Sequence, residues 1–193
     1  YGDFDDTGRN RIVEAEHGPN VVFPLRGRSC STNAMPSLAN RFPTFHDFAL
    51  ASLEEVYTPA CLEKAQSFAA TALRSGLLIN DGNGRFRFRP LARLAQASPG
   101  FGVALTDVDC DGILDLYIAQ NFFGPQRETG RMDGGVSLLL AGMGDGEFRP
   151  VWPKASGLIV PGDAKSLTVT DLNDDGWPDF VVAVNNGAVV AFT

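Results

Sequence analysis

One acidic nine-residue segment occurs twice in this chain, and the duplication constrains the fold more than any other feature. The copies are residues 107–115 and 171–179, which carry acidic or amide side chains at positions 1, 3, 5 and 9 and glycine at position 6. A turn sequence around Asp81 also recurs, around Asp145, and its two copies have the same separation as the two acidic segments. Two independent markers with one common offset, the repeat interval, indicate an internal repeat.

Both segments have the composition of a calcium-binding loop. Carboxylates held this close repel one another unless a hard cation lies between them, and calcium takes about six to eight oxygen ligands. The glycine at position 6 permits a sharp turn. Each segment continues into an apolar stretch that is typical of a strand. An EF-hand is excluded, because position 12 is Ile118 or Val182 within that stretch instead of a glutamate.

The sequence therefore predicts about two Ca²⁺ ions, one in each loop. The predicted ligands of the first loop are the side chains of Asp107, Asp109, Asp111 and Asp115 and the carbonyl of Ile113. Those of the second loop are the side chains of Asp171, Asn173, Asp175 and Asp179 and the carbonyl of Trp177. The position 7 carbonyls are included by analogy with other calcium loops.

A third, degenerate copy of the loop opens the chain. Asp3, Asp5 and Thr7 fall at positions 1, 3 and 5, and Gly8 falls at position 6, but Arg11 stands at position 9. A cationic side chain at the last ligand position is unfavourable for a metal ion. We expect this loop to be metal-free or weakly filled and to keep the shape of the repeat without the ion.

The loops and the residues before them resemble a known repeat. Residues 101–105, Phe-Gly-Val-Ala-Leu, followed by Asp-x-Asp-x-Asp-Gly-x-x-Asp, resemble the FG-GAP repeat, also called the VCBS repeat. Integrin α propellers contain similar calcium loops. Residues 24–31, 76–82 and 161–167 extend the resemblance to the C-terminal part of bacterial FG-GAP/VCBS proteins related to the ASPIC/UnbV and cartilage-acidic-protein group.

The resemblance implies a mainly β fold made of β-propeller blades. About three repeats are present, whereas a closed propeller usually has at least about four blades. We therefore expect residues 1–193 to form a single partial propeller domain, completed by blades upstream or, less favoured, by another chain.

Residues 43–74 have helical spacing within this strand-rich chain. Thr44 can cap a first helix, with Asp47 three residues on, and Thr58-Pro59 suits the start of a second helix. This segment predicts a two-helix insertion packed on its own domain. Residues 24–42, which carry prolines and glycine, predict a loop.

Charge and apolar content exclude several classes of partner. The net charge is −7, so no basic surplus favours nucleic acid. The sequence has no apolar run of the roughly 18 residues that a membrane span needs. The chain begins at Tyr1 inside a motif, which suggests a piece of a longer protein. Weak calcium modules work outside the cytoplasm, so we expect export to the periplasm, cell surface or extracellular space.

The cysteines leave the redox state open. Cys30 and Cys61 could pair and leave Cys110 free, or all three could be thiols, because sequence alone does not settle connectivity.

The predicted function is a non-catalytic calcium-binding module that binds a protein or a glycan or serves as a scaffold. We predict no catalytic residues, because the sequence lacks a nucleophile elbow, a phosphate-cradling loop and a histidine-based zinc cluster. One alternative is a propeller hydrolase that uses clustered aspartates for acid–base chemistry. Another is an accessory subunit of a large multiprotein complex.

Overall fold

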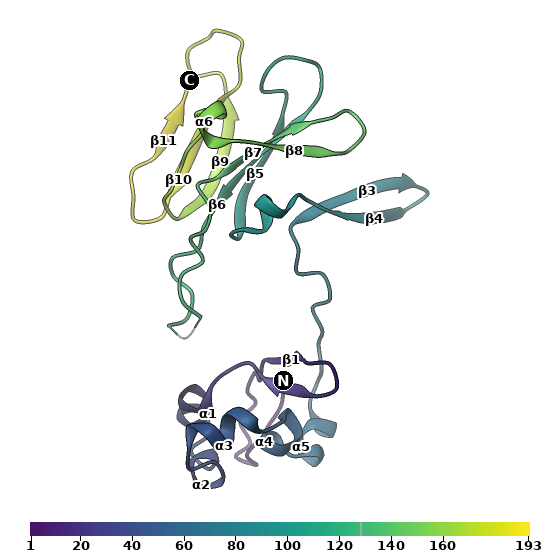
Figure 1. The fold of residues 1–193 in the computed structure, drawn as a ribbon, viewed down its shortest axis with the longest axis vertical. Coiled ribbons are helices and arrows are strands. Elements are labelled where there is room, and N and C mark those ends of the chain that lie inside the picture. Colours follow the sequence, from purple (N-terminus) through teal and green to yellow (C-terminus); the bar gives the residue numbers. More distant parts are fainter. Residues whose placement is uncertain (128) are drawn as a thin grey trace. The chain divides into compact units, whose positions relative to one another are not determined.

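The computed structural model describes residues 1–127 and 129–193. The chain divides into two compact units, Tyr1–Thr71 and Ala72–Thr193 (Figure 1). The first unit is mainly helical, and the second is built from small antiparallel sheets. The architecture is mixed and mostly β, and the sheets formed by the described residues do not close into a propeller. The single partial propeller domain stays a prediction.

The first unit combines one small hairpin with short helices. Strands β1 (Ala15–His17) and β2 (Val22–Pro24) pair antiparallel. Five helices follow: α1 (Arg28–Ala34), α2 (Leu38–Arg41), α3 (Phe45–Leu50), α4 (Leu53–Tyr57) and α5 (Pro59–Lys64). They share one apolar core made of Met35, Leu38, Phe48, Ala51, Val56 and Tyr57. Within the described residues, none of the helices has the length and apolar composition that a membrane span requires.

Side-chain caps fix where α3 and α4 begin. The Asp47 backbone nitrogen donates to Thr44 Oγ1 at 3.1 Å, which confirms the predicted cap. Ser52 forms a capping box, because its backbone nitrogen donates to Glu55 Oε2 at 2.7 Å and its Oγ accepts from the Glu55 nitrogen at 3.2 Å. A cap of this kind typically stabilises a helix by about 1 kcal/mol. The second cap starts a new helix where the sequence predicts one continuous helix.

The helical segment differs from the predicted residues 43–74 at both ends, and within those residues three helices, α3, α4 and α5, stand where two were predicted. The expected loop over residues 24–42 is wrong, because it contains α1 and α2. Burial of Met35 and Leu38 in the shared core outweighs the local turn signals. At the other end α5 stops at Lys64, since Phe68 and Leu73 are 79% and 85% exposed and find no core to pack against.

The described residues of the second unit form three antiparallel sheets. Strands β3 (Gly76–Gly82) and β4 (Arg85–Pro90) form a hairpin. A four-stranded sheet contains, in order, β5 (Gly100–Thr106), β6 (Asp115–Gln120), β7 (Leu138–Gly142) and β8 (Phe148–Val151). A three-stranded sheet contains β9 (Ala164–Thr170), β10 (Asp179–Val184) and β11 (Val190–Phe192), with β10 in the middle. The 3₁₀ helix η1 (Arg93–Gln96) precedes β5, and helix α6 (Pro153–Ser156) follows β8.

The strand bounds keep the repeat interval of the acidic loops. Strand β9 begins and ends one repeat interval after β5, and β10 begins and ends one repeat interval after β6. The first acidic loop therefore connects β5 to β6, and the second connects the equivalent strands β9 and β10. The structure thus contains the repeat that the sequence indicates. Both acidic loops lie between equivalent strands.

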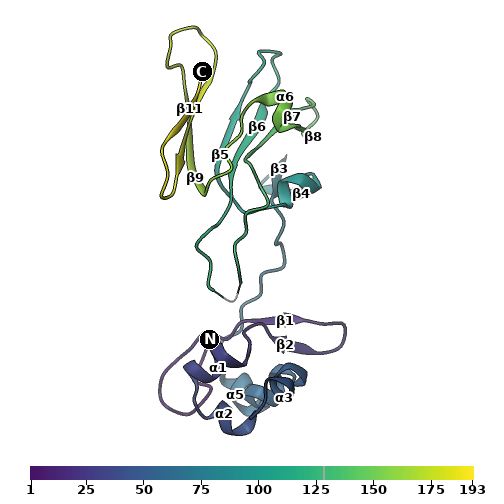
Figure 2. The same cartoon turned by 60° about the vertical axis from the view of Figure 1, so that its left-hand side comes forward.

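The two larger sheets pack on each other through β5 and β9, which lie side by side in both views (Figure 2). Gly102 allows this approach, because a Cβ there would lie 2.8 Å from the backbone nitrogen of Leu167. The rings of Tyr117 and Phe180 meet edge to face with centroids 5.0 Å apart. The shared core contains Tyr117, Ala119, Leu139, Leu158, Val160, Ala164, Phe180 and Val182. This core fixes the ends of β5 and β6, from which the first acidic loop projects.

Candidate metal centre

The first acidic loop is a tight turn closed by a strand pair at its base. Thr106 and Asp115 are partners in the β5–β6 ladder, so the loop leaves and rejoins the sheet at one point. Cys110 and Gly112 have φ values of 58° and 87°, in the left-handed region. Glycine adopts this conformation at little cost, which explains its place at position 6.

Carboxylates of the loop accept hydrogen bonds from its own backbone. Asp107 Oδ1 accepts from the Asp111 nitrogen at 3.0 Å, and Asp107 Oδ2 accepts from the Gly112 nitrogen at 2.8 Å. Asp109 Oδ1 accepts from the Asp111 nitrogen at 3.3 Å. Asp111 Oδ1 accepts from the Ile113 nitrogen at 2.8 Å. These bonds draw the side chains at positions 1 and 3 inward over the turn.

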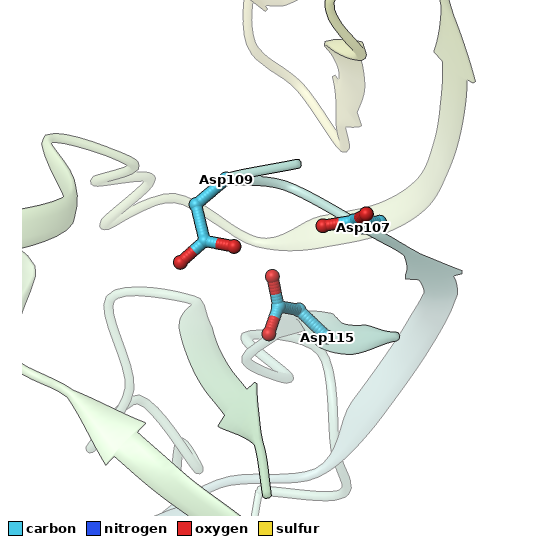
Figure 3. Close-up of side chains that lie close together, drawn as sticks. All are labelled: Asp107, Asp109 and Asp115. Atoms are coloured by element: carbon cyan, nitrogen blue, oxygen red, sulfur yellow. The ribbon is translucent and has the colours of Figure 1, made fainter. Parts of the chain in front are cut away.

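Three carboxylates converge above the base of the loop (Figure 3). Asp107, Asp109 and Asp115 each offer an oxygen atom, and these atoms lie within 4.8 Å of one another. Across the described part of the chain, no lysine or arginine forms an ion pair with any of the three. An all-oxygen donor set of this charge suits a hard divalent cation. The group could therefore bind a metal ion.

Asp115 also has a structural role. It is 5% exposed, its Oδ2 accepts from the Val108 nitrogen at 3.0 Å, and its Oδ1 accepts from the Gly142 nitrogen at 2.8 Å. One side chain therefore joins the loop to β7. Asp111 lies outside the converging group, and the roles of Asp111 and of the Ile113 carbonyl as ligands stay predictions.

The second acidic loop repeats this geometry. Asp171 accepts from the Asp175 nitrogen at 3.1 Å and from the Gly176 nitrogen at 2.9 Å. Asp179 is 2% exposed, and its Oδ2 accepts from the Leu172 nitrogen at 2.7 Å. The loop backbone is thus held by the same bonds at positions 1 and 9 as in the first loop.

One carboxylate of the first loop is an amide in the second. Asn173 stands at position 3, where its Oδ1 accepts from the Asp175 nitrogen at 3.1 Å and its Nδ2 donates to Asp175 Oδ2 at 2.9 Å. Trp177, at position 7, is 51% exposed. Metal binding by Asp171, Asn173, Asp175, Trp177 and Asp179 stays a prediction.

The degenerate loop at the start of the chain contains an arginine among its acidic and hydroxyl groups. Asp3 Oδ1 accepts from the Thr7 nitrogen at 3.2 Å. Asp5 Oδ1 and Arg11 Nη1 form an ion pair at 2.7 Å. The predicted weak ligands Asp3, Asp5 and Thr7 thus lie in one turn, and the side chains of Asp5 and Thr7 contact the Arg11 guanidinium.

A cavity of about 370 Å³ opens beside the first loop. Asp109 and Asp115 belong to its polar lining, and Leu139, Leu158 and Phe180 form much of its apolar lining. The cavity lies between the two larger sheets, because its lining comes from both of them. One side of the candidate metal centre therefore faces a largely apolar cavity.

A polar network joins the two larger sheets, and the sequence alone gives few signs of it. Lys165 Nζ pairs with Asp163 Oδ1 at 2.6 Å and donates to the Asn121 carbonyl at 2.8 Å. The same ammonium lies 3.5 Å from the centroid of the Phe101 ring. Asn185 Nδ2 donates to Asp163 Oδ2 at 3.0 Å. One signal is visible in the sequence, since Asn121 and Asn185 directly follow equivalent strands and are separated by the repeat interval.

The network holds Asp163 ionised although the residue is only 2% exposed. Burial acts to raise the pKa of Asp163, but hydrogen bonds from Lys165, Asn185 and the Phe123 nitrogen and the charge of Lys165 outweigh it and lower the pKa. Asn121 is fully buried, and its Nδ2 donates to the Gly135 carbonyl at 2.8 Å. The network thus links the strand ends opposite the acidic loops.

The cysteines form no disulfide in this structure. Cys30, Cys61 and Cys110 are free, and Cys110 is exposed at position 4 of the first acidic loop.

Comparison with known proteins identifies one repeat in this chain. Residues 68–118 match the FG-GAP-like repeat. The matched segment runs from before β3 through the first acidic loop into β6. No curated protein and no solved structure matches the chain. The match therefore covers one copy of the internal repeat, and the copy around residues 171–179 is tied to it by the repeat interval.

Proposed function

We propose, on the premise that residues 68–118 are an FG-GAP-like repeat, that this chain is a non-catalytic, calcium-binding segment of a β-propeller. In this proposal it serves as a binding or scaffold module for a protein or a glycan. Residues 107–115 and 171–179 would each hold one Ca²⁺ ion between the first two strands of a blade. The ion would close the loop and fix where β6 and β10 begin.

The observation that carries the proposal is the convergence of Asp107, Asp109 and Asp115. Their oxygen atoms lie within 4.8 Å of one another at the base of β6. Three carboxylates at this distance destabilise the loop by mutual repulsion unless a cation offsets their charge. The recurrence of the same backbone bonds around Asp171 and Asp179 supports a second ion.

The expected energies favour a structural role for the metal. Extracellular calcium modules bind with dissociation constants of about 10⁻⁴ to 10⁻³ M. At a dissociation constant of about 0.1 mM and about 1 mM calcium, each site would stabilise the fold by roughly 1.4 kcal/mol. This is a sizeable part of a stability that is typically about 5–15 kcal/mol.

Calorimetric titration of the 193-residue chain with calcium tests the proposal. We expect about two ions for each chain, with Asp109→Ala and Asp175→Ala each abolishing one of them. Asp133→Ala is the matched control, because Asp133 is exposed in the same unit and lies outside both loops. A chain that binds no calcium, or an Asp109→Ala variant that binds as the wild type does, would refute the proposed function.

Placement in a larger propeller has its own support. Val103 and Leu105 on β5 are 61% and 54% exposed, whereas their counterparts one repeat interval later, Leu167 and Val169, pack on the shared core. An apolar pair packed in one copy and exposed in the other favours a further sheet over β5. Without that sheet we expect the chain to self-associate, and Leu105→Lys should make it monomeric in light scattering. A monomeric wild-type chain would remove this support.

Export is proposed on the same chemistry. Loops of this kind are half filled at about 0.1–1 mM calcium, a concentration found outside the cytoplasm. The proposal places the protein in the periplasm, at the cell surface or outside the cell. A dissociation constant below about 1 μM would match a cytoplasmic sensor instead and would contradict this placement.

A further inference from the structure

The first loop of the chain has the backbone of the two candidate metal loops. Asp3 Oδ2 accepts from the Gly8 nitrogen at 2.6 Å, as Asp107 Oδ2 accepts from the Gly112 nitrogen at 2.8 Å. Asp6 and Gly8, at positions 4 and 6, have φ values of 53° and 74°. The same positions of residues 107–115 have φ values of 58° and 87°, so both loops turn through the left-handed region at the same two places.

The antiparallel backbone pairing at the base of each loop fixes which residues correspond. Gly2 and Arg11 exchange backbone hydrogen bonds of 3.0 and 2.8 Å. In the acidic loops the equivalent pairs are Thr106 with Asp115 and Thr170 with Asp179. In each pair, the first residue directly precedes the loop and the second is the residue at position 9. Arg11 therefore occupies the backbone position of the last acidic ligand.

The guanidinium of Arg11 reaches the oxygen atoms that would otherwise face an ion. Arg11 Nη1 donates to Asp5 Oδ1 at 2.7 Å, to the Arg9 carbonyl at 3.2 Å and to Thr7 Oγ1 at 3.4 Å. These atoms belong to positions 3, 7 and 5, the positions from which calcium loops draw their ligands. One nitrogen thus gathers three oxygens from three different positions.

The contact is more enclosed than an ordinary surface ion pair. The side chains of Arg11 and Asp5 are 20% and 8% exposed. The three acceptors of Arg11 Nη1 include a main-chain carbonyl and a hydroxyl, which a simple charge pair does not require. A guanidinium keeps its charge at any physiological pH and offers several fixed donors. It can therefore hold the loop under all calcium concentrations.

We propose that Arg11 replaces the metal ion in residues 3–11, so that this loop is closed by the protein's own cation and takes no calcium. Arg11 is then the residue that decides whether the loop binds a metal. It contributes a positive charge where a divalent ion would stand, and it removes the carboxylate at position 9. The first unit keeps its loop when calcium is depleted, whereas the loops of the second unit respond to calcium.

This inference rests on the proposed function in one respect, because it takes residues 107–115 and 171–179 as the metal-binding reference. Its first test does not depend on them. Hydrogen exchange of the Thr7 and Gly8 amides is measured on the full chain in chelator and in about 1 mM calcium. We expect slow exchange that is the same in both solutions, and exchange about tenfold faster in Arg11→Ala. Protection that needs calcium in the wild type, or protection unchanged in Arg11→Ala, would overturn the proposal.

The second test restores the missing ligand. Arg11→Asp should raise the calcium stoichiometry in calorimetry by one ion above that of the wild type. Folding of the variant only in the presence of calcium would also support the proposal. An unchanged stoichiometry, with the first unit folded, would overturn it. If the wild type binds no calcium, the proposed function fails, while the exchange test still decides the role of Arg11.

Discussion

Asp115 Oδ1 accepts a hydrogen bond of 2.8 Å from the backbone nitrogen of Gly142, although the two residues lie 27 positions apart. The other oxygen of Asp115 accepts from the Val108 nitrogen within its own loop. The same carboxylate lies within the converging group with Asp107 and Asp109. Ordering of the loop is thus coupled directly to the end of β7, an inner strand of the sheet.

Asp115→Ala should destabilise the second unit with or without calcium. It would leave the backbone nitrogens of Val108 and Gly142 without their acceptor, at a cost of about 2–4 kcal/mol. Asp109→Ala should lower stability only when calcium is present, because Asp109 is exposed and accepts one hydrogen bond of 3.3 Å. Urea unfolding in chelator and in calcium measures both. Equal stability of Asp115→Ala and the wild type in chelator would contradict the structural role of Asp115.

Lys165→Met should weaken the packing between the two larger sheets. It keeps the length of the side chain but leaves the Asp163 carboxylate buried without its cation, which typically costs about 3–5 kcal/mol. Lys154→Met is the matched control, because Lys154 is exposed on α6, and its effect should stay within about 0.5 kcal/mol. Denaturant unfolding measures both variants. Similar small losses in the two would show that the network contributes little.

Stability should fall in acid through Asp163. Its pKa is lower in the folded chain than the usual 3.8, so its contribution is present above that pH and is lost as pH falls through the folded pKa. The difference in unfolding free energy between wild type and Asp163→Asn should therefore shrink below about pH 4. A difference that stays constant between about pH 5 and pH 2 would refute this assignment.

Tyr117 should produce the opposite dependence in alkali. Burial raises its pKa from 10.0 to about 12, against the effect of its hydrogen bond with Ser137. Its contribution is complete below the unfolded pKa of about 10 and is lost as pH rises through about 12, by about 2–3 kcal/mol. Unfolding of Tyr117→Phe should lack this loss, whereas Tyr1→Phe, at a 49% exposed position, should behave as the wild type. If the unfolding free energies of Tyr117→Phe and the wild type changed in parallel with pH, the role assigned to Tyr117 would be contradicted.

Much of the second unit could be predicted because its signals are local and repeated. The spacing of carboxylates and glycine in residues 107–115 determines a turn, and the apolar stretch after it determines a strand. The repeat interval then predicts that β9 and β10 repeat β5 and β6. The convergence of Asp107, Asp109 and Asp115 follows from the same spacing.

The remaining features depend on contacts that sequence proximity does not show. Helices α1 and α2 form because Met35 and Leu38 pack against residues of α3 and α4, which outweighs the glycine and proline signals around them. Lys165 has its partner ring at Phe101, on a different sheet, so local pattern does not distinguish it from a surface lysine. Arg11 looks only unfavourable for metal until its three oxygen contacts are seen.

Thermal unfolding of the full chain in chelator and in about 1 mM calcium tests the central claim most directly. Two sites of about 1.4 kcal/mol each should raise the melting temperature of the wild type by roughly 5–10 °C. The Asp109→Ala, Asp175→Ala double variant should show no such rise, and Asp133→Ala should show all of it. A wild-type melting temperature that is the same in both solutions would contradict calcium binding by the acidic loops.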